Sequence, residues 1–235
     1  AFDTAANAAA IDVQLERAAR AGAALAVFPE CGLTGFKARK DLSHAHIAEA
    51  LAQVQASVAR HRISALVPSI ELDRSTRPRN RARLFAADGT VRAVFEKNGL
   101  TPSEKQWFVA GLREWPRGFT LGGLRFGVMF CDELNQGPRR FVREPVDVLL
   151  WPGYWGHGAP LDWASDGPHE AHARARACAE DFAAPLLQAN FRRPDENPPR
   201  QNVVVMGGSL AVAPDGTLLH SFEPQRREPL LIRVA

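Results

Sequence analysis

The sequence predicts an α/β fold, a four-layer α-β-β-α sandwich in which two mixed sheets lie between outer helices. Stretches of helical length and periodicity alternate with short apolar runs of strand length along the chain, which is the pattern of an α/β protein. Two Asp-Gly pairs, Asp88-Gly89 and Asp215-Gly216, are typical hairpin turns, so antiparallel strand pairs are also expected. A sandwich with helices outside and two sheets inside satisfies both observations.

The first half of the chain alternates in this way from its start. Residues 5–22 are expected to form a helix, because Ile11, Leu15 and Ala18 recur at helical spacing and Gly22 ends the run. The elements expected next are a strand over 24–28, a helix over 44–61, a strand over 64–70, and a hairpin of strands over 82–87 and 91–96. The polar, Arg-rich stretch 74–83 contains Pro78 and is expected to be a loop.

The second half continues the alternation. Strands are expected over 124–130, 146–151, 186–189, 203–206 and 209–213, and helices over 138–144 and 170–182. The turn at 214–216 leads into the last strands, and the stretch 191–200, rich in proline and charge, is expected to be a surface loop.

Length and composition fit one globular domain over residues 1–235. The chain is 46% hydrophobic, 23% charged and carries a formal net charge of +3. That charge is too small to indicate a nucleic-acid partner, and no apolar run approaches the roughly 18–20 residues that span a bilayer. The three cysteines, Cys31, Cys131 and Cys178, are too few and odd in number for a disulfide framework, which favours a reducing, cytoplasmic compartment.

Two residues stand directly after apolar strands, where α/β proteins place their active sites. Cys131 ends the strand 124–130 and precedes a polar stretch, so it is a candidate nucleophile; taken alone, a core cysteine is the commoner case. Glu30 follows the strand 24–28, where a partly buried carboxylate suits a general base. A helix cap or a surface charge in a turn is the alternative for Glu30.

Two further charged residues follow the strand 91–96. Lys97 ends that strand, and an ammonium there can stabilise a developing oxyanion or remain solvated. Glu104 lies in Thr101-Pro-Ser-Glu104, which is typical of the start of a helix with an acid in its first turn, so capping is its alternative role.

Taken together and in order, these residues fall in segments that resemble the signatures of one family. The segment Pro29-Glu-Cys-Gly-Leu-Thr-Gly-Phe36 resembles the first signature of the nitrilase superfamily, the carbon–nitrogen hydrolases. Lys97-Asn-Gly-Leu100 with Glu104 resembles its lysine motif, and Gly127-Val-Met-Phe-Cys-Asp132 its cysteine motif. Later landmarks resemble the family too, at 151–155, 176–180, 188–190, 208–209 and 214–216. The residues after Cys131 depart from the family pattern, in which an aromatic residue usually precedes the acidic one.

The resemblance implies a nitrilase-like fold and a mechanism. It makes Cys131 the nucleophile, Glu30 the general base, Lys97 the oxyanion-stabilising group and Glu104 the second glutamate, which orients Lys97. It implies no metal and no organic cofactor, and a homodimer or higher homo-oligomer paired through outer helices. It also implies that the usual first strand, before the region of Asn7, lies outside this chain.

Three further residues are expected to bind a small-molecule substrate. Asp132 follows the nucleophile, and Tyr154 and Trp155 belong to an aromatic stretch after a strand, which suits a pocket wall and surface packing about equally. Such a chain is expected to be an amidase that releases ammonia from a small linear amide. The alternatives are an N-carbamoyl hydrolase or nitrilase, an acyltransferase, and an inactive binding or oligomerisation module.

Overall fold

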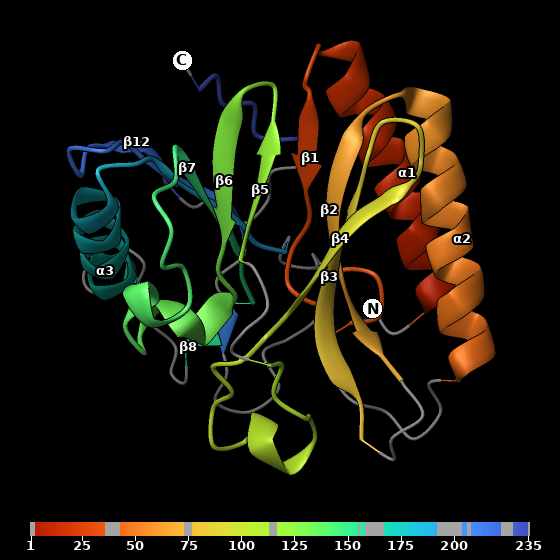
Figure 1. Ribbon diagram of the computed structural model, residues 1–235, viewed down its shortest axis with the longest axis horizontal. Coiled ribbons are helices and arrows are strands. Elements are labelled where there is room, and N and C mark those ends of the chain that lie inside the picture. The colour runs from red at the N-terminus through yellow and green to blue at the C-terminus, as the bar shows by residue number, and fades with distance from the viewer. Residues whose placement is uncertain are drawn as a thin grey trace. The chain divides into compact units, whose positions relative to one another are not determined.

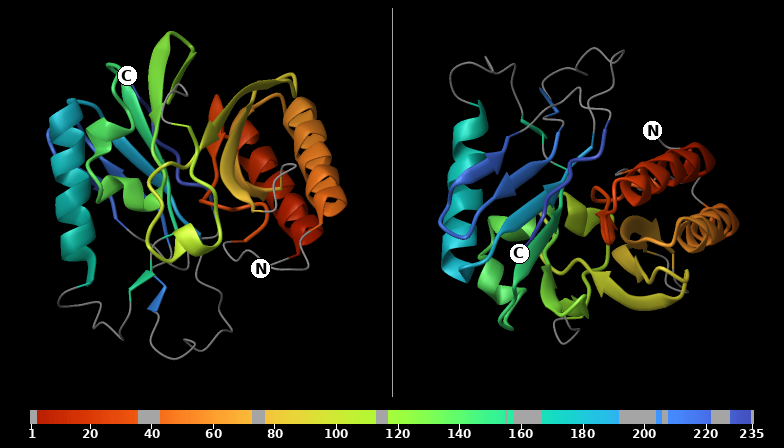
Figure 2. Two further views of the ribbon diagram at one scale, coloured as in Figure 1. Left: turned by 60° about the horizontal axis from the view of Figure 1, so that its bottom comes forward. Right: turned by 90° about the horizontal axis from the view of Figure 1, so that it is seen from above.

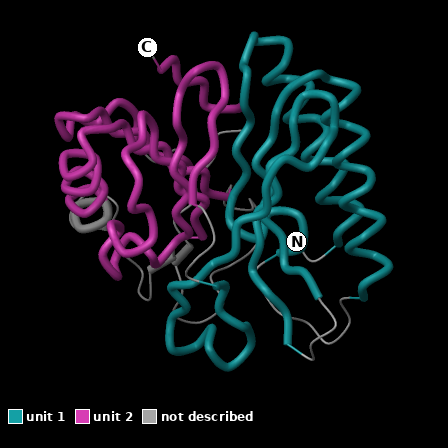
Figure 3. The backbone as a smooth tube through the Cα atoms, viewed as in Figure 1, with its two compact units in different colours: residues 1–116 teal, residues 117–235 magenta. Residues whose placement is uncertain are grey.

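The computed structural model describes residues 3–35, 43–72, 77–112, 117–154, 156–157, 167–191, 204–205, 208–221 and 228–234. The chain divides into two compact units, residues 1–116 and 117–235 (Figure 3). Among the helices described, none is both long and apolar enough to cross a membrane.

The first unit holds a four-stranded mixed sheet in the order β1-β2-β3-β4 (Figure 1). Its strands are β1 (Leu25–Val27), β2 (Ser64–Glu71), β3 (Arg79–Phe85) and β4 (Val91–Glu96). Strand β1 runs parallel to β2, whereas β2, β3 and β4 pair antiparallel. The parallel pair needs a long connection, and helix α2 lies within it.

Two helices, α1 (Thr4–Arg20) and α2 (His44–His61), pack side by side on one face of this sheet (Figure 2). Each begins at a side-chain cap: Asp3 Oδ1 accepts the Ala5 and Ala6 N–H groups, and Ser43 Oγ accepts the His46 N–H. The buried side chains between helices and sheet include Leu15, Val54, Val67 and Phe85. Burying each such side chain stabilises the unit by about 1.5–3 kcal/mol.

The second unit holds a six-stranded mixed sheet in the order β12-β11-β9-β7-β6-β5. Its strands are β5 (Gly118–Leu121), β6 (Leu124–Val128), β7 (Val148–Pro152), β9 (Leu186–Ala189), β11 (Leu210–Val212) and β12 (Leu218–His220). Strands β6, β7 and β9 are parallel, and the outer pairs are antiparallel. A short pair, β8 (Gly156–His157) and β10 (Val204–Val205), stands apart from this sheet.

Helix α3 (Gly167–Phe182) covers a face of the second sheet (Figure 2). Ala175, Ala179 and Phe182 pack there against strand residues such as Leu149 and Leu186. Three single 3₁₀ turns complete the described elements: η1 (Glu104–Gln106) in the first unit, and η2 (Cys131–Leu134) and η3 (Pro138–Arg140) in the second. Mixed sheets flanked by helices confirm the α/β class.

The prediction of a loop over 74–83 is wrong from residue 79 onward, where β3 begins. In β3 the arginines at 79, 81 and 83 alternate with buried Asn80, Ala82 and Leu84. Buried carboxylates neutralise the arginines: Glu96 pairs with Arg79 and Arg81, and Glu71 with Arg81 and Arg83. A stretch that looks like a charged loop is therefore a strand whose charges are paired across the sheet.

One other expectation also changes, and the structure adds a strand that the sequence did not predict. The helix expected over 138–144 is only the single turn η3, because the short stretch offers no run of apolar residues for a helix to bury. Strand β5 was not predicted, since its four residues are too few for a periodic pattern. Most of the loop expected over 191–200 lies outside the described residues.

Candidate active site

Glu30 lies on a tight turn directly after β1. The Phe28 N–H donates to the Leu66 carbonyl (3.0 Å) and the Leu33 N–H to the Pro68 carbonyl (3.1 Å), so the turn stays tied to β2 on both sides of Glu30. Cys31 has a left-handed backbone, with φ of 53°. The apolar run that forms β1 thus delivers a carboxylate to the carboxyl end of a parallel strand, as the sequence predicted.

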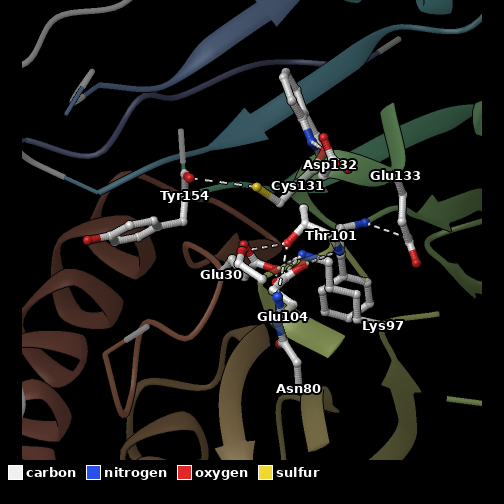
Figure 4. A network of polar contacts seen from close by, with 12 residues as sticks. Glu30, Asn80, Lys97, Thr101, Glu104, Cys131, Asp132, Glu133 and Tyr154 are labelled. Atoms are coloured by element: carbon white, nitrogen blue, oxygen red, sulfur yellow. Dashed lines mark hydrogen bonds and ion pairs between the residues drawn. The ribbon is translucent and has the colours of Figure 1, made fainter. Parts of the chain in front are cut away.

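Lys97 joins two carboxylates in the first unit (Figure 4). Its Nζ donates to Glu30 Oε1 at 2.8 Å and to Glu104 Oε1 at 2.7 Å. The three residues are only 2%, 1% and 3% exposed for Glu30, Lys97 and Glu104. Buried charges are tolerated only when they are paired and hydrogen-bonded, so the ammonium and its two carboxylates depend on one another. The structure therefore brings three of the four candidate catalytic residues into direct contact.

Glu104 makes contacts of both kinds that the alternative readings of the sequence predict, one to a turn and one to Lys97. Its Oε2 accepts the Thr101 backbone N–H at 2.8 Å, and Thr101 Oγ1 accepts the Glu104 N–H at 3.2 Å. This reciprocal pair is a capping box, and it leaves Oε1 for Lys97. The cap fixes the carboxylate in the orientation that the lysine requires.

Asn80, on β3, is part of this cluster and was missed from the sequence. Its Nδ2 donates to Glu30 Oε1 at 2.8 Å, and its backbone carbonyl accepts the Lys97 N–H at 2.9 Å. It is buried among the apolar residues of its face of the strand. The available signal was the alternation of Arg79-Asn-Arg-Ala-Arg83, which places Asn80 on the opposite face from the arginines; assigning this stretch to a loop concealed it.

Cys131 belongs to the second unit and stands at a sharp bend after β6. Its φ is 32°, a left-handed conformation that costs a non-glycine residue about 1–3 kcal/mol and that recurs at functional sites. The thiol is half-buried and donates to the Tyr154 carbonyl at 3.6 Å (Figure 4). The Cys131 carbonyl accepts the Trp151 Nε1–H at 2.9 Å. A strained strand-to-turn bend of this kind presents a nucleophile at the end of a sheet.

The residues expected to bind substrate have different surroundings. Both carboxylate oxygens of Asp132 accept hydrogen bonds that close the turn η2, from Asn135 at 2.7 Å and from Gln136 at 2.8 Å. Tyr154 is exposed, and its ring packs against Phe191 with centroids 4.5 Å apart. Trp155 lies outside the described residues. Within the described part of the chain, no three His, Cys, Asp or Glu side chains are grouped to hold a metal ion.

Comparison with known protein families identifies one that matches this chain. The family profile of carbon–nitrogen hydrolases matches residues 1–233. No curated protein sequence matches the chain.

Solved structures share the fold. An amidase from Nesterenkonia sp. is 24% identical with a TM-score of 0.75, over 93% of this chain and 80% of that one. A cysteine-to-alanine variant of the Nesterenkonia AN1 amidase, from the nitrilase superfamily, is 22% identical with a TM-score of 0.76 over the same shares. A glutamate-to-glutamine variant of the amidase from Nesterenkonia sp. AN1 is 23% identical with a TM-score of 0.75, again over 93% of this chain and 80% of that one. That structure shows the acetamide moiety of fluoroacetamide added covalently at the active-site cysteine. These likenesses confirm the nitrilase-like fold, and the match over residues 1–233 shows that the chain is an enzyme of the carbon–nitrogen hydrolase family.

Proposed function

We propose that the chain is an amidase that hydrolyses a small linear amide through a thioester on Cys131. The observation that carries the proposal is the buried, hydrogen-bonded cluster of Glu30, Lys97 and Glu104. It provides a carboxylate base and an ammonium held next to it, which are the groups that cysteine-dependent amide hydrolysis needs. The left-handed bend that holds Cys131 supports its role as nucleophile. The solved amidases of the same fold favour an amide over other carbon–nitrogen substrates.

In the first half of the proposed reaction, Glu30 removes the thiol proton and the thiolate attacks the amide carbon. A carbon–sulfur bond forms, and the carbonyl electron pair moves onto the oxygen. Lys97 and a backbone N–H near Cys131 stabilise that oxyanion. When the oxyanion collapses, the carbon–nitrogen bond breaks, Glu30 returns the proton to nitrogen, and ammonia leaves a thioester on Cys131.

In the second half, Glu30 accepts a proton from water, and the resulting hydroxide attacks the thioester. The carbon–sulfur bond breaks, the carboxylic acid leaves, and the proton returns to sulfur. Glu104 keeps Lys97 in place throughout, and Asn80 donates to Glu30 and holds its carboxylate. We assign Asp132, Tyr154 and Trp155 to substrate contacts.

The experiment that tests this function measures ammonia release from small amides, N-carbamoyl compounds and nitriles. The comparison is between the wild type, Cys131→Ala and the matched control Cys178→Ala, which replaces a buried cysteine of α3. We expect ammonia from amides with the wild type and with Cys178→Ala, and none with Cys131→Ala. Activity in Cys131→Ala would contradict the mechanism, whereas ammonia from only nitriles or carbamoyl compounds would replace the amide as substrate.

Fluoroacetamide supplies a direct probe, since it leaves its acetamide moiety on the active-site cysteine of a glutamate variant of the Nesterenkonia amidase. Incubation of Glu30→Gln with fluoroacetamide should add that mass to the peptide containing Cys131 and to no other peptide. Labelling of another peptide, with the Cys131 peptide left unlabelled, would contradict the role of Cys131 as nucleophile.

A further inference from the structure

We propose that Arg117 and Glu133 clamp the bend at Cys131 and are positioning residues for the nucleophile. This inference rests on the role proposed for Cys131 above. It concerns only the second unit, in which a buried ion pair adjoins the bend. The effect that we assign to the two residues acts through the backbone that carries the thiol.

Glu133 holds the residue that precedes the nucleophile. Its Oε2 accepts the Phe130 backbone N–H at 2.9 Å, and its own N–H donates to the Phe130 carbonyl at 2.8 Å. Its Oε1 accepts Arg117 Nη2 at 2.9 Å. Glu133 is 0% exposed and Arg117 is 3% exposed. A fully buried carboxylate that spans a backbone N–H and a guanidinium has little freedom to move.

Arg117 is itself fixed at two points. Its backbone carbonyl accepts the Val128 N–H at 2.7 Å, which ties it to the end of β6. Its guanidinium lies over the rings of Phe130 and Phe141, 5.4 Å and 5.9 Å from their centroids. Arg117 therefore binds the strand that leads into the bend through its backbone carbonyl, and the carboxylate that follows the bend through its guanidinium.

The consequence for Cys131 follows from the two peptide groups on either side of its Cα. The group before it contains the Phe130 carbonyl, which accepts the Glu133 backbone N–H, and the Glu133 carboxylate holds the same residue from its other end by accepting the Phe130 N–H. The group after it contains the Cys131 carbonyl, which accepts from Trp151. Because both peptide planes are held, the φ of 32° cannot relax, and the direction of the Cα–Cβ bond is fixed. The carboxylate two places after the nucleophile thus acts on the direction of the thiol through Phe130, whose N–H it accepts.

The second unit also offers a matched control. Asp147 accepts the Arg125 backbone N–H at 2.8 Å and Arg125 Nη2 at 3.1 Å. This pair repeats the pattern of a carboxylate that spans a backbone N–H and a guanidinium, but it lies at the start of β6 and is partly exposed. Asp147→Asn removes the same kind of charge without touching the bend.

The experiment compares the wild type, Glu133→Gln, the apolar double variant Arg117→Met/Glu133→Leu, and Asp147→Asn. Each folded protein, held well below its Tm, is treated with iodoacetamide, and the labelling rate of the Cys131 peptide is followed by mass spectrometry. Tm and, with an amide substrate, kcat and KM are measured beside it. We expect Glu133→Gln to slow both labelling and kcat roughly tenfold or more with little change in KM, because the loss lies in orientation and not in substrate binding.

The double variant separates positioning from stability. It removes both buried charges, so its Tm should recover relative to Glu133→Gln, while labelling and kcat should stay low because Phe130 has lost its carboxylate acceptor. The proposal would be overturned if labelling and kcat returned together with Tm in the double variant. It would also be overturned if labelling and kcat in Glu133→Gln matched those in Asp147→Asn. Alkylation by iodoacetamide needs no amide hydrolysis, so if the wild type released no ammonia the proposed function would fail while the labelling rates still decided the clamp.

Discussion

At the scale of single residues, Glu104 shows that one carboxylate can serve the local fold and the proposed chemistry through different oxygens. Oε2 closes the capping box with Thr101, and Oε1 binds Lys97. A capping glutamate and a catalytic glutamate have the same sequence pattern, so the sequence could not choose between them. In the structure the two oxygens have different partners, so the cap and the proposed catalytic contact are compatible.

Mutation can separate the cap that Glu104 forms from the catalytic role proposed for it. Glu104→Gln removes the negative charge that pairs with buried Lys97, and we expect kcat/KM to fall roughly 100-fold. Thr101→Val removes only the hydroxyl that accepts the Glu104 N–H, and we expect it to lower the free energy of unfolding by about 1 kcal/mol with activity nearly unchanged. Steady-state kinetics and denaturant unfolding measure the two effects. Equal losses of activity in both variants would show that the cap, not the charge, matters.

Asn80 makes a second prediction at this scale. Asn80→Ala deletes the donor to Glu30 Oε1, and we expect kcat to fall roughly 10- to 100-fold because the base is no longer held. The matched control is Ser69→Ala, which also removes a buried donor to a buried carboxylate, but to Glu71. Kinetics of both variants give the comparison. The prediction fails if Ser69→Ala loses as much activity as Asn80→Ala.

At the scale of elements, the sequence was most informative where a strand or helix has a clear period. The bounds of α2, β4 and β9 agree with those expected, since each has an apolar face and a defined end. It was least informative where tertiary contacts decide the structure. β3 looked like a loop because the carboxylates that neutralise its arginines belong to β2 and β4. Asn80 was hidden by the same error, so one misassigned strand also removed a site residue.

The bend after β6 could be predicted only in part. The apolar run 124–130 placed Cys131 at the end of a strand, but neither its left-handed φ nor its partners can be read from the sequence. Arg117 and Trp151, which hold the bend, come from segments 14 and 20 residues away. Side-chain contacts over such separations depend on strand order, which periodicity does not determine.

Strand β7 contributes to the bend through the indole of Trp151. Trp151→Phe keeps an aromatic ring in the core but removes the N–H that donates to the Cys131 carbonyl at 2.9 Å. We expect kcat to fall roughly tenfold, because one of the two peptide planes beside the nucleophile is released. Trp107→Phe is the control, since Trp107 is 56% exposed and should leave kcat unchanged. Equal kcat in both variants would contradict this role of the indole.

At the scale of the whole molecule, the proposed catalytic set is distributed over both compact units. Glu30, Lys97 and Glu104 belong to residues 1–116, and Cys131 to residues 117–235. Each unit has its own sheet and buried core. The order of the family signatures along the chain predicts the whole set, because the resemblance extends over both units.

The stability of the whole molecule is expected to fall at acid pH. Hydrogen bonds lower the pKa values of three surface carboxyls, from Arg125 to Asp147, from Thr90 to Asp88 and from Thr217 to Asp215. A carboxyl with a lowered folded-state pKa contributes stability above its unfolded value, and this is lost as the pH falls through the folded value. We therefore expect Tm to drop below about pH 4, with a smaller drop in Asp147→Asn.

On the alkaline side, the decisive group is Cys178 in α3. Burial, together with the charge of Asp181, raises the pKa of its thiol to about 12, although Arg139 opposes the shift. Above about pH 9 the unfolded chain loses this proton while the folded chain keeps it. The free energy of unfolding therefore falls by about 1 kcal/mol as the pH rises from 9 to 10. Thermal unfolding across this range should show a steeper loss of stability for the wild type than for Cys178→Ala. The small cavity left by alanine lowers Tm by an amount that does not change with pH, so only the slope reports the thiol. Parallel slopes for the two proteins would mean that Cys178 ionises as readily in the folded chain as in the unfolded one, and the alkaline loss would then have to come from other groups.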